Sequence, residues 1–280
     1  MSSRRRPDSQ PSSARRRRSN AAPASDSTPT DNPDEWVPDS DLFLDGIDTA
    51  AEASSPMAGV GVPAVVAVVA TRNAGERLDS LLASLAGQEY ANLVTLIVDA
   101  GSTVDPTERV AEILPSAFVK RIDSEKFADA ANAALGTVDG ASFYLFLHDD
   151  VELGPGTVQA MVEEAFRSNA GIVGAKIVQG VDPTKIETVG AAIDKFGFLW
   201  PIAETGELDQ SQHDAIREAF VVSSAAMLIR CDLFRDLGGF STDIDGSGED
   251  LDLCWRARVA GARTVVMPAA TVVHHHESGY

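Results

Sequence analysis

The sequence predicts an α/β fold: a mostly parallel central sheet flanked by helices, with a smaller mixed region after it. Two observations support this fold class. Short, wholly apolar runs rich in β-branched residues, such as Ala64–Ala70 and Leu93–Val98, are typical of strands covered on both faces. These runs alternate with helix-spaced leucines and alanines from about residue 64 to residue 168. Alternating strands and helices indicate a parallel sheet with helices on both faces.

The first strand is followed by leucines at helical spacing, at positions 78, 81, 82 and 85, which predict the first helix. The later elements of this half are expected as a strand at Leu93–Val98, a helix at Thr107–Ile113, a strand at Ala117–Ile122, a helix at Ala128–Leu135, a strand at Ser142–Leu147 and a helix at Gly156–Arg167.

After residue 168 the pattern is mixed, which predicts the smaller region. Gln210–Phe220 is a polar, mobile stretch, and a helix is expected at Asp250–Val259, with Ser247 as its cap and with Trp255 and Val259 on its apolar face. Strands are expected at Gly171–Val178, Ile186–Ile193, Thr264–Met267 and Thr271–Val273, and Val221–Ile229 leads into a short helix that ends at Gly238.

Residues 1–62 are rich in Ser, Pro, Ala, Asp and Arg and show little apolar periodicity, so they predict a disordered tail. Residues 63–280 form the expected folded domain, which can also be the catalytic module of a longer protein. The arginine clusters Arg4–Arg6 and Arg15–Arg18 suit peripheral contact with an anionic membrane. A solvated tail without a dedicated partner is an equal alternative.

The charge is unevenly distributed. The chain carries −19 in total, but residues 1–18 hold seven arginines and one aspartate, which leaves −25 for the rest. So acidic a domain argues against a general nucleic-acid partner and suits a site that collects cations. No apolar run reaches the roughly 18–20 residues of a membrane span, and the N-terminal segment lacks the apolar core of a secretory signal peptide. Cys231 and Cys254 fit a reducing cytoplasm, so we expect a cytoplasmic protein that can also lie at the inner face of the plasma membrane.

Three polar clusters follow strands of the predicted sheet: Thr71–Asn73, Asp99–Thr103 and His148–Asp150. Because ligands bind at the carboxyl ends of parallel strands, we expect these clusters to converge on one edge of the sheet. Asp149 and Asp150 have the chemistry to hold a divalent ion such as Mg²⁺ or Mn²⁺ together with substrate phosphates. An ordinary acidic turn is the plainer interpretation of this pair.

Other polar groups each allow two interpretations. Asp250 is either a general base or a carboxylate that complements the helix dipole. Among His274–His276, one imidazole suits a metal site and the other two suit the surface. Asp99 is either a partner for the imide nitrogen of uracil or thymine, or a turn aspartate. Cys254 is expected in the core.

Taken in order, these segments resemble the inverting family 2 glycosyltransferases of the GT-A fold, especially the bacterial rhamnosyltransferase-like and galactofuranosyltransferase-like members. The resemblance covers roughly residues 63–276. It rests on the first strand and its Thr-x-Asn turn at Val68–Asn73, the base-binding loop at Asp99–Thr103, the Asp-x-Asp position at Leu147–Asp150, the Glu-Asp-x-Asp-Leu-x-x-Arg segment at Glu249–Arg256, and Pro268 followed by His274.

The resemblance implies a role for each matching residue. Asp150 and His274 would coordinate the metal, Asp149 would face the sugar or ribose, and Asp250 would deprotonate the acceptor hydroxyl. Thr71, Asn73 and Asp99 would contact the donor. The implied cofactor is a divalent ion, Mn²⁺ or Mg²⁺. The implied partners are a UDP- or dTDP-sugar donor and a glycan or lipid-linked acceptor in envelope synthesis.

Three positions depart from the family pattern. His148 stands where many members have the first aspartate, Ala100 replaces the second aspartate of the base-binding loop, and Ser124–Ala128 lacks the usual Asn and Gly. These departures motivate an alternative, a non-catalytic binding module recruited through its arginine-rich tail. A sugar nucleotidyltransferase is a third possibility, but it needs a glycine-rich nucleotide loop that residues 67–75 do not supply.

Overall fold

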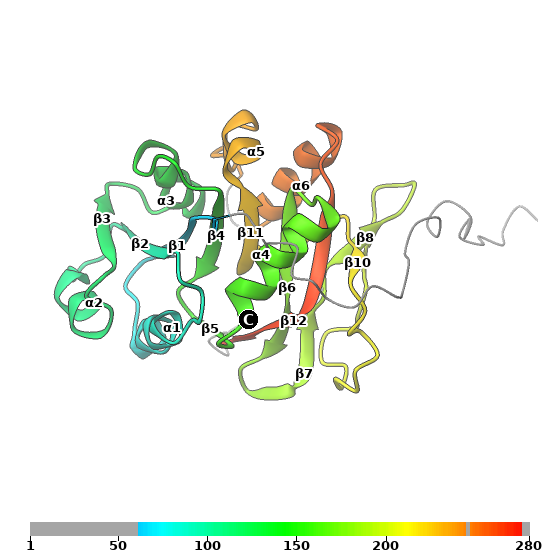
Figure 1. The fold of residues 1–280 in the computed structure, drawn as a ribbon, viewed down its shortest axis with the longest axis horizontal. Coiled ribbons are helices and arrows are strands. Elements are labelled where there is room, and N and C mark those ends of the chain that lie inside the picture. Colours follow the sequence, from blue (N-terminus) through cyan, green and yellow to red (C-terminus); the bar gives the residue numbers. More distant parts are fainter. Residues whose placement is uncertain (1–60, 245–246, 276–280) are drawn as a thin grey trace, which may run out of the picture. The chain divides into compact units, whose positions relative to one another are not determined.

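The N-terminal half forms the predicted parallel sheet. The computed structural model describes residues 61–244 and 247–275. Its strands here are β1 (Val65–Thr71), β2 (Leu93–Ala100), β3 (Phe118–Ile122) and β4 (Phe143–His148), in the order β3-β2-β1-β4 (Figure 1). The connecting helices are α1 (Glu76–Ala86), α2 (Thr107–Ile113) and α3 (Phe127–Asn132), the last followed by a 3₁₀ turn at Ala133–Gly136. The alternation predicted from the sequence is confirmed.

The C-terminal half extends the same sheet with mixed pairing. β11 lies antiparallel between β4 and β6, β12 runs parallel to β6, and the short β10 closes the edge. The bounds in this half are β5 (Val151–Leu153), α4 (Thr157–Ser168), β6 (Ile172–Gln179), β7 (Asp182–Thr188), β8 (Ala191–Ile193), β9 (Leu199–Pro201), β10 (Arg217–Glu218), β11 (Ala226–Arg230), α5 (Cys231–Asp236), α6 (Glu249–Val259) and β12 (Thr264–His274).

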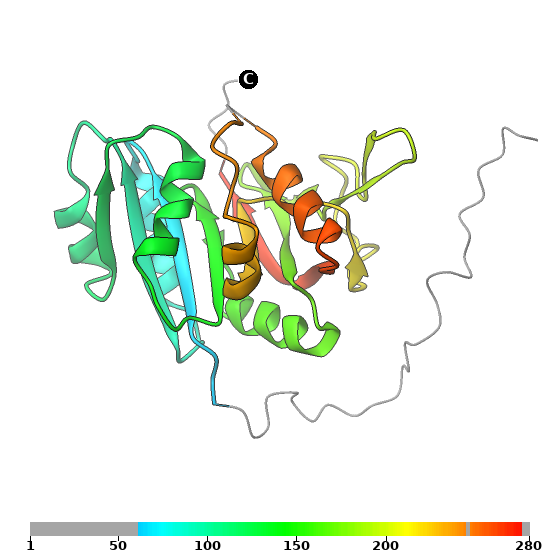
Figure 2. The ribbon, with the colours of Figure 1, turned by 90° about the horizontal axis from the view of Figure 1, so that it is seen from above.

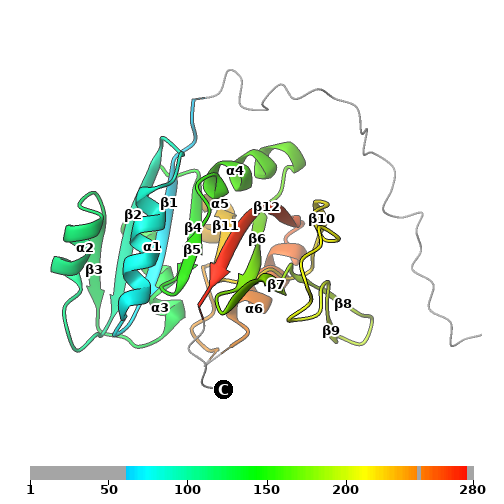
Figure 3. The same cartoon turned by 90° about the horizontal axis from the view of Figure 1, so that it is seen from below.

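Helices cover both faces of the sheet (Figures 2 and 3). Alternate side chains of β1 point to opposite faces, and each face has its own apolar core. One core packs the face of Val65, Ala67 and Val69 against the leucines of α1 and the apolar side of α4. The other packs Val66 and Val68 against α3, α5 and α6. The sheet is therefore buried on both sides, as its apolar strands predict.

β5 determines where the last strand ends. It follows His148–Asp150 directly and pairs antiparallel with β12, so that Val151 stands opposite His274. The backbone N–H of His275 also donates to the carbonyl of Asp150, at 2.9 Å. These contacts bring the end of β12 beside the end of β4. This strand was not predicted from the sequence, and it joins two parts of the chain that are widely separated in sequence.

Several element boundaries differ from those predicted. Ile186–Ile193 is divided between β7 and β8, because Gly190 adopts a left-handed conformation with φ +83°. The stretch Val221–Ile229 holds most of β11, which leads directly into α5, the short helix expected there. The two strands expected at Thr264–Met267 and Thr271–Val273 are one strand, β12, with an irregularity between Met267 and Thr271. Pro268 lies in that irregular stretch, where it removes no ladder hydrogen bond.

Two expectations about α6 are wrong. Its first turn is preceded by Gly248 in a left-handed conformation, and no side chain caps it, so Ser247 is not the cap. Trp255 and Val259 do not face the core, since they are 49% and 78% exposed. The buried side of α6 is instead Leu253, Cys254 and Ala257, which confirms the core assignment of Cys254.

The tail expected at residues 1–62 lies almost wholly outside the described residues, as does His276. No helix in residues 61–244 or 247–275 combines the length and the apolar character needed to cross a bilayer.

Candidate active site

The three polar clusters converge at one edge of the sheet, as predicted. Parallel register aligns their strands, with Thr71 beside Asp99 and Ala70 beside His148. The hydroxyl of Thr71 donates to Asp149 Oδ2 at 2.7 Å. The turn after β1 contacts the turn after β2 as well. Asn73 accepts a hydrogen bond from the backbone N–H of Thr103 at 2.8 Å.

Asp99 is fully buried at the end of β2, and both of its oxygens are engaged. Oδ2 accepts from Arg121 Nε at 2.8 Å, and Oδ1 accepts from the backbone N–H of Ser102 at 3.3 Å. The guanidinium of Arg121 also donates to the carbonyl of Ser102 at 2.9 Å. Because the Arg121 side chain is 45% exposed, it is the outward member of this pair. Sequence reasoning missed Arg121, whose partner lies on a neighbouring strand.

His148, Asp150 and His274 form a cluster with the donor set of a metal centre. One ligand atom from each residue lies within 4.8 Å of the others. His274 Nε2 is 3.1 Å from Asp150 Oδ1, and the rings of His148 and His274 are 5.5 Å apart between centroids. The predicted pair Asp150 and His274 is therefore brought together. His148, which stands where the family pattern has an aspartate, joins them as a third donor.

Glu187, on β7, orients His274 from behind. Its Oε1 lies 2.8 Å from His274 Nδ1, which leaves the Nε2 side of the ring toward Asp150. Burial alone lowers the pKa of His274, but the hydrogen bonds to Asp150 and Glu187 outweigh burial and raise this pKa to about 9. A carboxylate behind a ligating histidine is a common second partner in metal sites. No motif in the sequence pointed to Glu187.

Ser224 links this cluster to the start of α6. Its hydroxyl lies 3.3 Å from His148 Nε2 and donates to Glu249 Oε1 at 2.9 Å. The backbone of Ser224 also hydrogen-bonds to the carboxylate of Asp250. The other oxygen of Glu249, Oε2, is buried and has no hydrogen-bond partner among the described residues. The carboxylates that open α6 therefore lie next to the His148–Asp150–His274 cluster.

Both aspartates at the centre of this arrangement are electrostatically perturbed. Burial raises the pKa of Asp149, and the charge of Asp150 adds to the effect, while the hydrogen bond from Thr71 opposes it. Burial likewise raises the pKa of Asp250, and the neighbouring charge of Glu249 adds to it. Carboxylates with raised pKa values in a cleft are typical of acid–base groups.

Asp252 has a structural role. Its Oδ2 accepts from Arg256 Nε at 2.9 Å, and Arg256 also donates to the carbonyls of Leu237 and Gly239, each at 2.9 Å. The pair therefore fastens α6 to the segment that follows α5. Asp250 and Asp252 stand in the same turn but serve different surroundings.

A comparison with protein-family models decides the family. The model described as glycosyl transferase family 2 matches residues 66–238. The chain belongs to glycosyltransferase family 2. The resemblance inferred from its sequence motifs is thus confirmed.

Two curated relatives illustrate this family 2 relationship. A pre-mycofactocin glycosyltransferase of Mycobacterium tuberculosis is 28% identical over 240 residues, which cover 83% of this chain and 47% of that protein. An N-acetylglucosaminyl-diphospho-decaprenol L-rhamnosyltransferase of the same organism is 27% identical over 235 residues, 76% of each chain. The chain therefore spans about half the length of the first of these relatives.

Solved structures establish the GT-A fold of this family 2 chain. GalNAc-T7, crystallised with UDP, GalNAc and Mn²⁺, superposes with a TM-score of 0.63 over 78% of this chain and 45% of its own, at 12% identity. The mannosyltransferase PcManGT of Pyrobaculum calidifontis, in complex with GDP-Man and Mn²⁺, gives 0.58 over 81% of this chain and 61% of its own, at 19% identity. The predicted fold class is confirmed.

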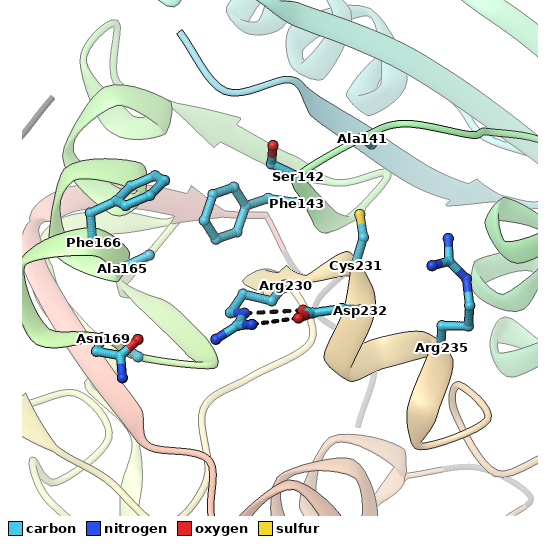
Figure 4. A pocket seen from close by; sticks show the side chains of 11 residues that line it. Ala141, Ser142, Phe143, Ala165, Phe166, Asn169, Arg230, Cys231, Asp232 and Arg235 are labelled. Atoms are coloured by element: carbon cyan, nitrogen blue, oxygen red, sulfur yellow. Dashed lines mark hydrogen bonds and ion pairs between the residues drawn. The ribbon is translucent and has the colours of Figure 1, made fainter. Parts of the chain in front are cut away.

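A cavity of about 400 Å³ lies at the opposite end of β4 (Figure 4). It is lined by the start of β4 at Phe143, by Phe166 of α4, by Arg230 at the end of β11 and by Cys231 and Arg235 of α5. Arg230 pairs with Asp232, which also lines the cavity. Because β4 reaches the polar edge at His148, this cavity is separate from the candidate active site of the family 2 domain.

Proposed function

We propose that the chain is a metal-dependent, inverting glycosyltransferase that moves a sugar from a nucleotide-diphosphate sugar to a hydroxyl acceptor. The observation that supports this best is the joining, through Ser224, of the His148–Asp150–His274 cluster to Asp250. A cation site beside a perturbed carboxylate is the arrangement needed for a charged leaving group and a hydroxyl nucleophile. Membership of family 2 supports the reaction class.

Asp150 and His274 are the proposed protein ligands of a divalent ion, Mn²⁺ or Mg²⁺, with His148 as a third donor. The residues fit such an ion, because two imidazoles and a carboxylate meet within 4.8 Å and Glu187 orients His274. Mg²⁺ prefers oxygen donors, so the two imidazoles favour Mn²⁺ between these ions. When bound, the ion neutralises charge that builds up on the departing diphosphate.

Asp250 is the proposed general base. Its raised pKa makes it a better proton acceptor than a solvated aspartate. It removes the proton from the acceptor hydroxyl, whose oxygen then attacks the anomeric carbon from the side opposite the nucleoside diphosphate. The bond to the diphosphate breaks as the new glycosidic bond forms, which inverts the anomeric configuration.

The donor is proposed to lie along the edge formed by Thr71, Asn73, Asp99 and Asp149. Thr71 fixes Asp149, which is proposed to face the sugar or ribose. Asp99 is held by Arg121, so contact with the base would involve the exposed guanidinium next to this aspartate. We assign the donor to the UDP- or dTDP-sugars, in line with the sequence motifs. GalNAc-T7 was crystallised with UDP.

The acceptor is proposed to be a glycan or a lipid-linked sugar in cell-envelope synthesis, on the cytoplasmic side. One relative is named as a rhamnosyltransferase that acts on N-acetylglucosaminyl-diphospho-decaprenol, which supports an acceptor of this class. The arginine clusters of the tail remain a proposed contact with anionic lipid. The buried free thiols of Cys231 and Cys254 suit a reducing compartment.

The non-catalytic binding module is the disfavoured alternative. The departures at His148 and Ala100 motivate it, but the imidazole of His148 joins Asp150 and His274 as a third candidate metal ligand. Ala100 is buried in the core beside Asp99. Membership of family 2 likewise gives no support to the nucleotidyltransferase alternative.

The proposal can be tested by thermal unfolding of the full chain with a panel of UDP-, dTDP- and GDP-sugars, each with Mn²⁺, with Mg²⁺ and with EDTA. A ligand that binds only the native state raises its stability, by about 2.7 kcal/mol at a hundred times its Kd. We expect one donor class to raise the melting temperature with Mn²⁺, less with Mg²⁺, and not with EDTA.

That donor should also release its nucleoside diphosphate slowly to water, and faster when an acceptor is supplied. Binding without any release, at all metal concentrations, would favour the non-catalytic module. A melting temperature that no sugar nucleotide changes, with either metal, would contradict the proposed function.

A further inference from the structure

The hairpin formed by β8 and β9 exposes four large apolar side chains within five residues. Phe196 is 75% exposed, Phe198 67%, Leu199 43% and Trp200 62%. Side chains this apolar are costly to leave in water, and a monomeric protein rarely gathers them at one place without a partner. The hairpin tip is therefore a candidate interaction surface.

The tip is held by hydrogen bonds within the hairpin. Asp194 Oδ1 accepts the backbone N–H groups of Phe196 and Phe198, at 2.8 and 2.9 Å, and the backbone of Gly197 donates to the Asp194 carbonyl at 3.0 Å. The Trp200 indole N–H points to Asp194 Oδ2 at 3.4 Å. These backbone N–H groups already have hydrogen-bond partners, so they do not need water. Backbone groups that enter an apolar medium must be paired within the protein.

The composition of the tip matches a membrane interface. Phe and Trp rings are favoured at the level of lipid headgroups, and a lysine beside them can keep its ammonium in water. Lys195 Nζ lies over the Phe196 ring, 5.1 Å from its centroid. Its charge offsets that of Asp194, so the tip brings no net charge toward the lipid.

The location of the hairpin fits this partner. Figures 2 and 3 both show β8 and β9 toward the edge of the domain at which β12 ends. Glu187, the partner of His274, precedes β8 by only a few residues, and Ala191 bridges to Val221 near Ser224. The base of the hairpin is therefore connected to residues of the candidate active site.

We infer that the β8–β9 hairpin is an interfacial anchor that inserts its aromatic tip into the headgroup region of a lipid bilayer. A protein partner fits less well, because stable protein interfaces bury about 1,200–2,000 Å² and require a complementary shape, and the tip is five residues long. A bilayer adapts to a protruding tip. The inference deepens the proposed function, since it would hold the site against a membrane that carries the acceptor, but it stands on the hairpin alone.

The test is binding of the full chain to vesicles of pure phosphatidylcholine. These vesicles carry no net charge, so the arginine clusters of the tail gain little from them and the apolar tip carries the binding. We expect the double variant Phe196→Ser/Phe198→Ser to lower the vesicle partition coefficient by about tenfold or more. The tryptophan fluorescence of the protein should shift to the blue with vesicles in the wild type and not in Trp200→Phe.

Phe118→Ser is the matched control, because Phe118 is also an exposed phenylalanine, at 64%, but lies on β3 at the other end of the sheet. It should bind vesicles as the wild type does. Equal partitioning of the wild type and the double variant would overturn the inference. So would a double variant that changes the sedimentation coefficient of the protein without lipid, which would assign the tip to contact between copies.

No nucleotide sugar is needed in these assays, so their failure would leave the proposed transferase activity untouched. Both serine variants should melt at the wild-type temperature, because the replaced rings are exposed.

Discussion

At the scale of single residues, Asp250 and Asp252 show how one helical turn can carry two different functions. Asp252 is paired with Arg256 and fastens α6 in place. Asp250 is half-buried beside Glu249, and both this burial and the charge of Glu249 raise the pKa of its carboxyl. The sequence allowed two interpretations for Asp250, because spacing along a helix does not reveal which side chains another segment will cover.

Asp250→Asn should lower the rate of sugar transfer by about 10²–10⁴-fold, because it removes the proton acceptor. The variant should also be more stable than the wild type at neutral pH, since burial and the charge of Glu249 both disfavour the ionised carboxylate. Asp252→Asn should have the opposite effects on rate and stability. It should lose little of the transfer rate, but its unfolding free energy should fall by about 1 kcal/mol, because the bond to Arg256 is weakened. Transfer assays and chemical unfolding measure both quantities.

The stabilisation expected for Asp250→Asn depends on pH. A carboxylate whose pKa is raised in the folded state destabilises the fold above that pKa, and the penalty disappears as the pH falls toward the ordinary value. The stability gained by Asp250→Asn should therefore be full at neutral pH and shrink in mild acid. The transfer rate of the wild type should fall in that same range. An Asp250→Asn variant that transfers sugar at the wild-type rate would remove the base assignment.

At the scale of elements, the apolar pattern of the sequence predicted the buried strands. It missed the strands that form only by pairing with a distant part of the chain. Val65–Thr71 and Leu93–Ala100 were recognisable, because strands covered on both faces are apolar throughout. β5 was not, since three residues after an acidic turn carry too little pattern, and its strand exists only by pairing with β12. The edge that carries the site was therefore predictable, but the contact between Asp150 and His274 was not derivable from pattern alone.

The segment between β9 and β10 was also hard to predict, because it is held by ion pairs to a distant residue. It looked like a polar, mobile stretch, yet Lys176 of β6, whose side chain is only 6% exposed, binds two of its acids. Lys176 Nζ lies 2.8 Å from Asp209 Oδ2 and 2.5 Å from Asp214 Oδ1. The segment is thus held to the central sheet by an ion triad in which the lysine is buried and Asp214 is half exposed.

Removing both acids, in Asp209→Ala/Asp214→Ala, should destabilise the protein by about 3 kcal/mol, because it leaves a buried ammonium without a counter-charge. Lys176→Met should cost clearly less, since it removes the buried charge and keeps the apolar stem. Urea unfolding at neutral pH measures the two values. If Lys176→Met proves the more damaging change, the triad does not stabilise the segment in the way described.

At the scale of the whole molecule, one GT-A sheet gathers acidic groups from both halves of the chain. The N-terminal half supplies Asp149 and Asp150, and the C-terminal half supplies Asp250 and His274. The sequence motifs predicted this set because each member follows a strand or opens a helix. Glu187 and Ser224, which orient the set, could not be predicted, since their partners lie 87 and 76 positions away in the sequence.

The proposed function requires that carboxylate and imidazole groups from distant parts of the chain bind one cation. Calorimetric titration of the full chain with Mn²⁺, in the presence of the donor found by thermal unfolding, measures this binding. Asp150→Ala and His274→Ala should each weaken Mn²⁺ binding by at least about tenfold. Glu152→Gln, which alters only the carboxylate paired with His275, should bind as the wild type does. Unchanged Mn²⁺ affinity in both Asp150→Ala and His274→Ala would show that these two residues do not form a shared cation site.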